Sequence, residues 1–131
     1  MGNGTEEDQI RSYRDLFAWQ RSMDLVDAVY RTTQRFPDHE KFGLISQMRR
    51  AAVSVPSNIA EGYGRGSTQE YLRFLRIARG SLFEVETQCL VGIRLGNISE
   101  EFGISVQEQI NAVAKVLSGL IGSIERKIGS A

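Results

Sequence analysis

Apolar residues recur every three or four positions along most of the chain, which is the period of an amphipathic helix. In the segment 15–36 this stripe consists of Leu16, Trp19, Met23, Val26 and Tyr30. Pro37 follows the segment directly, and the residue before a proline avoids the helical region of backbone space. The pattern therefore predicts a first helix over residues 15–36.

A second helix is predicted over residues 43–61, although it contains a proline. Its stripe consists of Leu44, Met48, Ala51, Ala52, Val55 and Ile59. Pro56 lacks an N–H and clashes with the carbonyl four residues back, so we expect a kink or a break at Ser54–Val55. Asn58 and Glu61 border the stripe beside this point. We expect them to have a structural role, bonding the backbone that the proline frees.

Two glycine-containing turns separate the remaining helices. Gly62 is predicted to end the second helix, and Ser67 with Glu70 fits a capping box that starts a third helix over residues 67–95. Gly96 then favours a left-handed cap. A fourth helix, ending near residue 128, has two alternative starts at Ser99 and Ser105, because Ser105-Val106-Gln107-Glu108 is also a capping box.

Four amphipathic helices joined by short loops indicate an all-α protein with an up-and-down four-helix bundle over residues 13–128. Residues 1–12 are predicted to be a flexible N-terminal tail. The first and third helices each have a second apolar face, with Trp19 or Phe83 nearby. Since a small bundle seldom needs two such faces, we expect the protein to form oligomers.

Composition narrows the functional classes. The chain has 131 residues, of which 41% are apolar, and its formal net charge is zero, so no global basic field indicates a nucleic-acid binder. A single cysteine excludes an intramolecular disulfide and favours a cytoplasmic location. No apolar run approaches the length of a membrane span, so we expect no membrane partner.

The sequence offers no set of residues for catalysis or metal binding. His39 is the one histidine, so the Glu-x-x-His pairs of a di-iron bundle are missing. Cys89 lies on the apolar stripe of the third helix without a histidine nearby, which favours a buried hydrophobe over a nucleophile. We therefore expect a non-enzymatic protein with no catalytic residues, metal or cofactor.

The stretch GYGRG (62–66) contains three glycines beside an arginine. It has neither the spacing of a dinucleotide fingerprint nor the Gly-Lys-Ser/Thr ending of a phosphate-binding loop, and no strand precedes it. The preferred interpretation is a tight reversal between helices. The alternative is an anion site, formed by the first N–H groups of the third helix and Arg65.

Positive charge is concentrated in the middle of the chain. Residues 43–83 contain six basic and two acidic side chains, for a net charge of +4. Arginine suits phosphate because its planar guanidinium donates in pairs. The alternative is that Arg49, Arg50 and Arg76 pair with Glu61, Glu84 or Glu86, within or between subunits. The candidate nucleic-acid-binding residues are Arg49, Arg50, Arg65, Arg73, Arg76 and Arg79.

Three segments resemble a known family: RDLFAWQRSMDLVDAVYRTTQRFP, FGLISQMRRAAVSVPSNIAEGYGRGSTQEYLRFLRIARGSLFEVETQ and RLGNISEE. It is the bacterial four-helix-bundle family named after proteins encoded in 23S rRNA intervening sequences. The most specific block is RRAAVSVPSNIAEG, and the resemblance extends over about residues 13–128. In this chain the block contains Arg49, Arg50, Pro56, Asn58, Glu61 and Gly62.

The resemblance implies a four-helix bundle that assembles as a ring- or barrel-shaped homopentamer. The family is also similar to the accessory variability protein of diversity-generating retroelements, which binds nucleic acid and a reverse transcriptase through basic surfaces. This chain differs from those basic relatives because its net charge is zero.

Two functional hypotheses follow. The first is a non-catalytic, homopentameric accessory protein that associates with RNA or DNA through its arginines, and with a reverse transcriptase or another protein. The alternative is a protein-interaction or assembly module whose arginines form intersubunit ion pairs.

Overall fold

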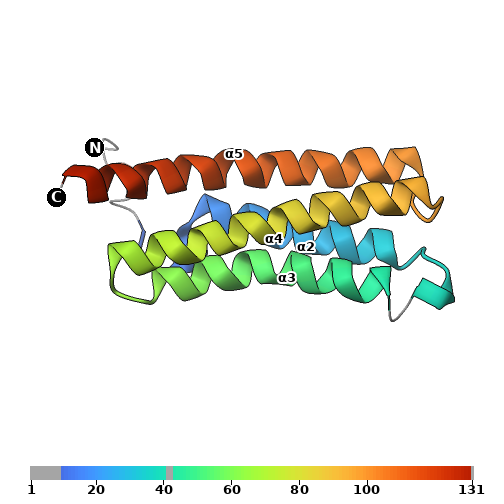
Figure 1. Cartoon of the computed structure of the whole chain (residues 1–131), viewed down its shortest axis with the longest axis horizontal. Helices are drawn as coiled ribbons and strands as arrows, with labels where there is room; N and C mark the ends of the chain where they lie inside the picture. Colours follow the sequence, from blue (N-terminus) through green and yellow to red (C-terminus); the bar gives the residue numbers. More distant parts are fainter. Residues whose placement is uncertain (1–9, 41–42, 131) are drawn as a thin grey trace.

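A computed structural model describes residues 10–40 and 43–130, and within them it contains four long helices and no strand. The helices are α2 (Phe17–Thr33), α3 (Leu44–Tyr63), α4 (Thr68–Arg94) and α5 (Glu100–Ser130), with short 3₁₀ turns η1 (Tyr13–Asp15) and η2 (Asp38–Glu40). The long helices lie side by side (Figure 1). The predicted all-α four-helix bundle is confirmed.

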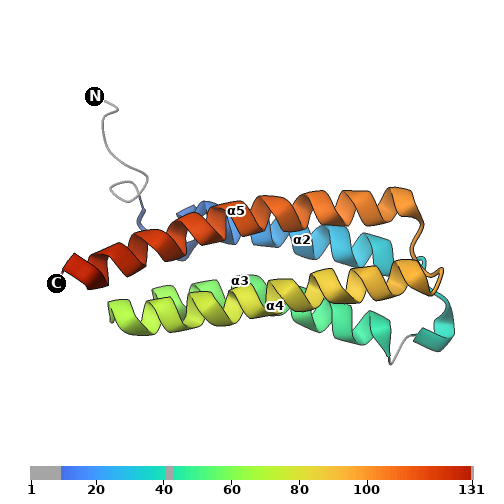
Figure 2. The same cartoon turned by 45° about the horizontal axis from the view of Figure 1, so that its top comes forward.

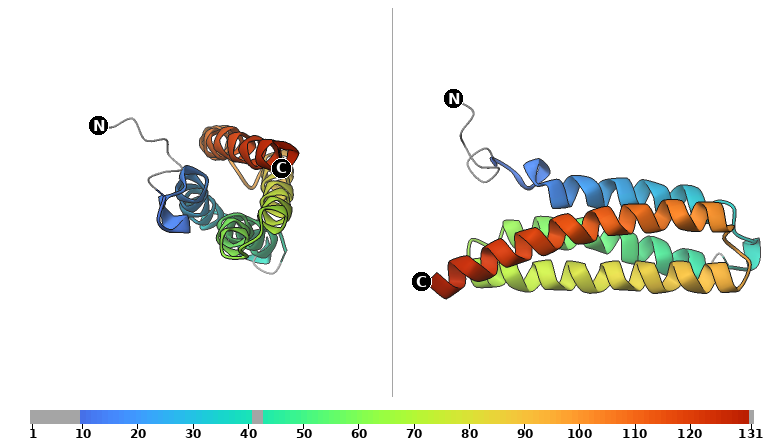
Figure 3. Two further views of the ribbon diagram at one scale, coloured as in Figure 1. Left: turned by 90° about the vertical axis from the view of Figure 1, so that its left-hand side faces the viewer. Right: turned by 90° about the horizontal axis from the view of Figure 1, so that it is seen from above.

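Each helix runs antiparallel to the next, so the bundle is up-and-down. The α2–α3 and α4–α5 connections lie at one end, and the α3–α4 loop lies at the other end (Figure 2). Seen along its axis, the bundle places α3 between α2 and α4, with α5 beside α4 and α2 (Figure 3). No helix in the described ranges has the length and apolar character of a membrane span.

The stripe predicted for the second helix is buried in the core, as the sequence indicates. The stripe predicted for the first helix is wrong, because Met23 and Tyr30 are exposed and α2 buries Leu25 and Val29 instead. The fully buried members of the core come from all four helices, and none of them is charged. The largest are Leu25, Met48, Ile59, Leu75, Leu82 and Leu117. Dense packing of these aliphatic side chains is the main stabilising contribution in such a bundle.

The helix ends differ slightly from the prediction. The first helix ends at Thr33, before Pro37, and its start is preceded by η1, which Ser12 caps by accepting a hydrogen bond from the Arg14 N–H (3.1 Å). The predicted tail lies outside the described residues over positions 1–9. At α5, the Ser99 hydroxyl accepts from the Phe102 N–H (3.3 Å), which settles the start at Ser99 rather than Ser105.

Pro56 does not break its helix. The structure keeps α3 continuous from Leu44 to Tyr63, so the predicted break at Ser54–Val55 is wrong, and the kink stays a prediction. Asn58 donates to the Ser54 carbonyl (2.8 Å) and hydroxyl (2.9 Å). The carbonyl that a proline frees is the one four residues back, at Ala52, so Asn58 does not replace the lost bond.

Gly62 is not the end of the helix. The helix continues to Tyr63, Gly64 follows as the cap, and the left-handed residue of the turn is Gly66 (φ +79°). Gly62 is instead a buried contact point with α4, because a Cβ at this position would lie 2.7 Å from the Phe74 Cβ. The predicted role of Gly62 as the helix end is therefore wrong, whereas the predicted tight reversal is confirmed and is made by Gly64 and Gly66.

Gly62→Ala is expected to destabilise the protein by about 1–3 kcal/mol, because its methyl group would push α3 away from α4. Chemical denaturation would measure the change. Gly119→Ala is the matched control, since a Cβ on Gly119 of α5 meets no atom within 4 Å. The control should be neutral or stabilising by up to about 1 kcal/mol. Equal stability of both variants and wild type would contradict the proposed close contact.

Candidate functional site: the arginines of α3 and α4

The structure distributes the six candidate arginines over different faces of the bundle. Neighbours on a helix point about 100° apart. Arg49 therefore turns toward α2, while the side chain of Arg50 is exposed. Arg76 reaches α5. The structure brings together Arg65, in the α3–α4 loop, and Arg73, near the start of α4.

Arg49 lies half-buried at the surface of the bundle, where α2 contacts it. Its Nε donates to the Thr33 hydroxyl (2.9 Å), and its Nη2 lies 3.5 Å from the Tyr30 carbonyl. The guanidinium also stacks on the Tyr30 ring, 4.4 Å from the centroid. These contacts join α3 to the last turn of α2, so Arg49 has a structural role.

Arg65 and Arg73 share the Phe74 ring. Their guanidinium carbons lie 4.8 and 4.6 Å from its centroid, which is within the range of cation–π attraction. Each also forms an ion pair with a carboxylate three or four residues before it: Arg65 with Glu61 at 3.4 Å, and Arg73 with Glu70 at 2.9 Å. Both pairs are solvent-exposed and so contribute little to stability.

The Arg73–Glu70 pair shifts both acid–base equilibria. The hydrogen bond from Arg73 lowers the pKa of the Glu70 carboxyl, and the same bond raises the pKa of the Arg73 guanidinium. Both groups are therefore held in their charged forms. Glu70 uses its carboxylate for Arg73, so only half of the predicted capping box is confirmed: the Ser67 hydroxyl accepts from the Glu70 N–H (3.1 Å).

Within the described chain, the ion pairs predicted for Arg49, Arg50 and Arg76 with Glu61, Glu84 or Glu86 do not occur. Glu61 pairs with Arg65 instead, and it is exposed rather than bonded to the backbone at Pro56. Arg76 pairs with Glu125 of α5 at 2.7 Å, a carboxylate that sequence reasoning did not consider. Glu86 accepts from Gln107 (2.7 Å) instead. Spacing along one helix could not reveal the Arg76 partner, which is 49 residues away.

Arg50 and Arg79 differ from the other four. Among the ion pairs between described residues, neither of them has a carboxylate within 4.0 Å. Arg50 is exposed on α3, and Arg79 is partly buried on α4. Arg49 likewise has no described carboxylate within this distance, but its guanidinium is bonded to Thr33 and stacked on Tyr30. Arg50 and Arg79 have neither an ion pair nor a ring contact with a described residue.

The proposed anion site at the start of α4 is not supported. The first turn of this helix already contains the Glu70 carboxylate, which is the favourable charge at a helix N-terminus. Arg65 is directed to Glu61 and to the Phe74 ring. An incoming anion would meet an acidic side chain there.

Cys89 and His39, the residues considered for catalysis or metal binding, lie on different elements, α4 and η2. Cys89 is buried, and burial raises the pKa of its thiol, with the Glu86 carboxylate adding to the effect. Its unreactive thiol form is therefore favoured. His39 is exposed in η2. Within residues 10–40 and 43–130, no three His, Cys, Asp or Glu side chains come close enough to hold a metal ion.

Comparison with known proteins identifies the family. The profile of the 23S rRNA-intervening sequence protein family matches residues 14–119. The chain belongs to this family. The block RRAAVSVPSNIAEG (49–62) is part of α3 and lies inside the matched region.

A solved structure supports the family fold. It is the crystal structure of a protein of unknown function from the S23 ribosomal protein family of Bacteroides thetaiotaomicron VPI-5482, at 22% identity and a TM-score of 0.73. The match covers 79% of this chain and 97% of that one. Among curated proteins, none matches this chain. At this identity the likeness concerns the fold alone.

Arg49→Ala is expected to lower the free energy of unfolding by about 1–2 kcal/mol, because it removes a hydrogen bond and a stacking contact. Chemical denaturation would measure it. The neighbouring Arg50→Ala, with the same loss of charge, should change stability by no more than about 0.5 kcal/mol. Identical effects would show that Arg49 has no special structural contribution.

Proposed function

We propose that this protein is a non-catalytic, cytoplasmic assembly module that forms a homo-oligomer through an exposed apolar patch of α4 and α5. The supporting observation is that large apolar side chains face solvent on the outer side of these two helices. The pairing of four of the six arginines with groups of their own chain favours this function over charge-driven binding.

The patch consists of Phe83 and Leu90 on α4 and Ile104 on α5. Their exposed fractions are 54%, 54% and 61%, which are high for such apolar side chains. Phe83 and Leu90 are seven residues apart, so they lie on the same face of α4. A contiguous exposed apolar surface is typical of an interaction site.

The α4–α5 register brings Ile104 to the level of Leu90. Gln107 donates to Glu86 across the two antiparallel helices (2.7 Å). Leu90 lies one turn beyond Glu86, and Ile104 lies about one turn before Gln107, so the two steps run in the same direction. Gly80, one turn before Phe83, has open space around its Cβ position and would let a partner helix approach closely.

The resemblance implies five copies. A closed ring of five requires two different surfaces on each subunit, which meet head to tail. The patch on α4 and α5 would supply one of them. Burial of side chains such as Phe83 and Leu90 is worth about 1.5–3 kcal/mol each, which is enough to shift an association equilibrium strongly.

A Phe83→Asp/Leu90→Asp variant is expected to dissociate, since each subunit would bury two charges in the interface. Light scattering coupled to gel filtration should give about five times 14.7 kDa for wild type and 14.7 kDa for the variant. Gln47→Asp, on the exposed surface of α3, is the control and should keep the wild-type mass. A wild-type mass of 14.7 kDa would refute the assembly function.

A second candidate is association with RNA or DNA, supported by Arg50 and Arg79. Their guanidinium groups are not neutralised by direct contact with described carboxylates, and α3 and α4 pack side by side. In an oligomer, each such pair of charges would be repeated around the ring. This repetition could produce a local positive surface on a chain with zero net charge.

Fluorescence anisotropy with labelled single-stranded RNA tests this second function. Wild-type affinity should fall steeply between about 50 and 200 mM salt, and Arg50→Ala/Arg79→Ala should flatten the log–log slope by about 1.4. Arg21→Ala/Arg31→Ala removes the same charge from exposed positions of α2 and should leave the slope unchanged. Absence of binding at low salt, to RNA and to DNA, would refute nucleic-acid association.

A further inference from the structure

α2 carries an outer apolar stripe that the bundle leaves partly open to solvent. In steps of four, three and four residues, the stripe consists of Trp19, Met23, Val26 and Tyr30. Met23 and Tyr30 are 40% and 38% exposed, and the other two are half-buried. The buried stripe of the same helix lies one position earlier and consists of Ala18, Ser22, Leu25 and Val29. Because neighbouring residues of a helix point about 100° apart, α2 has two separate apolar sides.

α4 has the same arrangement of two stripes. Its buried stripe includes Ala78, Leu82, Val85 and Cys89. One position later, again in steps of four, three and four residues, its outer stripe consists of Arg79, Phe83, Glu86 and Leu90. Phe83 and Leu90 are the α4 members of the patch proposed above for assembly. The outer stripes of α2 and α4 therefore match in length and spacing.

The two outer stripes lie on different sides of the bundle. α3 and α5 separate α2 from α4 (Figure 3). The stripe of α2 lies toward α3, since the guanidinium of Arg49 stacks on the Tyr30 ring. The stripe of α4 lies toward α5, where Glu86 accepts a hydrogen bond from Gln107. One chain therefore cannot cover its own α4 stripe with its own α2 stripe, but two copies can meet head to tail.

The stripes also lie at a similar level along the bundle. α2 and α4 run in the same direction (Figure 2). Shortly after the end of each stripe the two chain segments meet, because a Cβ at Gly92 would lie 3.4 Å from the Phe36 ring. A second copy can therefore bring its α2 stripe beside the α4 stripe of the first with little shift along the axis.

We propose that the outer stripe of α2 is the surface that binds the α4–α5 patch of a second copy of the chain. The inference rests on the proposed assembly function and names the second surface that head-to-tail assembly requires. With the two helices parallel, the layers of contact are Trp19 with Arg79, Met23 with Phe83, Val26 with Glu86, and Tyr30 with Leu90. Alternating steps of three and four residues are those of a coiled-coil seam, in which side chains of one helix fit between those of the other.

Two of the four layers are apolar. The Met23 thioether meets the Phe83 ring, which is a favourable sulfur–aromatic contact. The Tyr30 ring lies against Leu90. All four side chains are exposed in the single chain, so their removal from water favours association.

The two other layers each contain one charged side chain. Arg79 has neither an ion pair nor a ring contact with a described residue, and the Trp19 ring of the second copy offers it a cation–π contact. Glu86 keeps its hydrogen bond from Gln107, so its carboxylate is not left unpaired beside Val26. Both charges are therefore accommodated in the interface.

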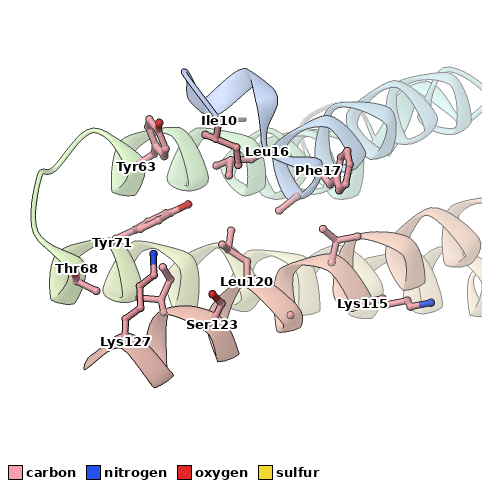
Figure 4. A pocket seen from close by; sticks show the side chains of 14 residues that line it. Ile10, Leu16, Phe17, Tyr63, Thr68, Tyr71, Lys115, Leu120, Ser123 and Lys127 are labelled. Carbon is pink, nitrogen blue, oxygen red and sulfur yellow. The ribbon is translucent and has the colours of Figure 1, made fainter. Parts of the chain in front are cut away.

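A cavity of about 670 Å³ at the end of the bundle beside the α3–α4 loop is separate from this surface (Figure 4). No residue of either outer stripe lines it. Among the residues that do, Phe17, Tyr71 and Lys127 already have interaction partners. The outer stripe is therefore the better candidate for a binding surface on α2.

Met23→Asp tests the inference by placing a charge against the Phe83 ring of the second copy. In light scattering coupled to gel filtration, its mass should fall from that of the wild-type oligomer to 14.7 kDa. Gln47→Asp adds the same charge to the exposed surface of α3, away from both stripes, and should keep the wild-type mass. If Met23→Asp keeps the wild-type mass, the inference is wrong and the assembly function stands. A wild-type mass of 14.7 kDa would refute both.

Mixing two variants separates the loss of a surface from the loss of the fold. Met23→Asp retains the α4–α5 patch, and Phe83→Asp/Leu90→Asp retains the α2 stripe. Over a range of protein concentrations, the mixture should form a complex of about twice 14.7 kDa, because one intact interface joins the two chains and no further interface can form. A mixture that stays at 14.7 kDa at every concentration would overturn the proposed pairing.

Disulfide cross-linking tests the register of the two helices. Two cysteines can bond only when their Cα atoms lie within about 7 Å, as they do in one layer of a parallel pair. On oxidation, Met23→Cys/Phe83→Cys should link several copies covalently, whereas each single variant should not, since Cys89 is buried. Met23→Cys/Leu90→Cys, which is out of register by two layers, is the matched control. Equal cross-linking of the two double variants would overturn the proposed register.

Discussion

The close contact between α3 and α4 is the constraint on which the rest of the structure depends. At Gly62 the two backbones approach so closely that a single methyl group would clash with Phe74, and further along the pair the hydroxyls of Ser54 and Ser81 share a hydrogen bond of 2.8 Å. Small residues at these positions let the helices pack at short range, where dispersion forces between many atoms add up. The buried apolar residues of the pair then pack against α2 and α5.

This helix pair also explains why the candidate arginines do not form one site. On a helix, adjacent residues point in different directions, and close packing turns one side of each helix into the core. Arg49 is thereby directed to α2, Arg76 to α5, and Arg65 with Arg73 to the ring of Phe74. A cluster in the sequence becomes several separate contacts, most of which join elements of the same chain.

Two features of the surface involve α5. Along its middle and first turns the helix follows α4, and the exposed apolar side chains of the two helices form one patch. At its C-terminal end the helix leaves the axis and opens a cavity with a lysine directed inward. An exposed apolar surface such as this patch suits contact with another protein chain.

The sequence by itself determined the number of helices, their approximate bounds and the all-α architecture, because the helical period of apolar residues depends only on local spacing. From its one histidine and one cysteine it also predicts no metal or nucleophile constellation, and this stays a prediction. Only the tertiary structure decided that Gly62 is a packing point, that α3 passes through Pro56 unbroken and that Arg76 meets Glu125. The Gly62 and Arg76 contacts join residues on different helices, which local spacing cannot reveal. The continuity of α3 depends on whether the surrounding packing stabilises the helix at a proline that its local sequence would not tolerate.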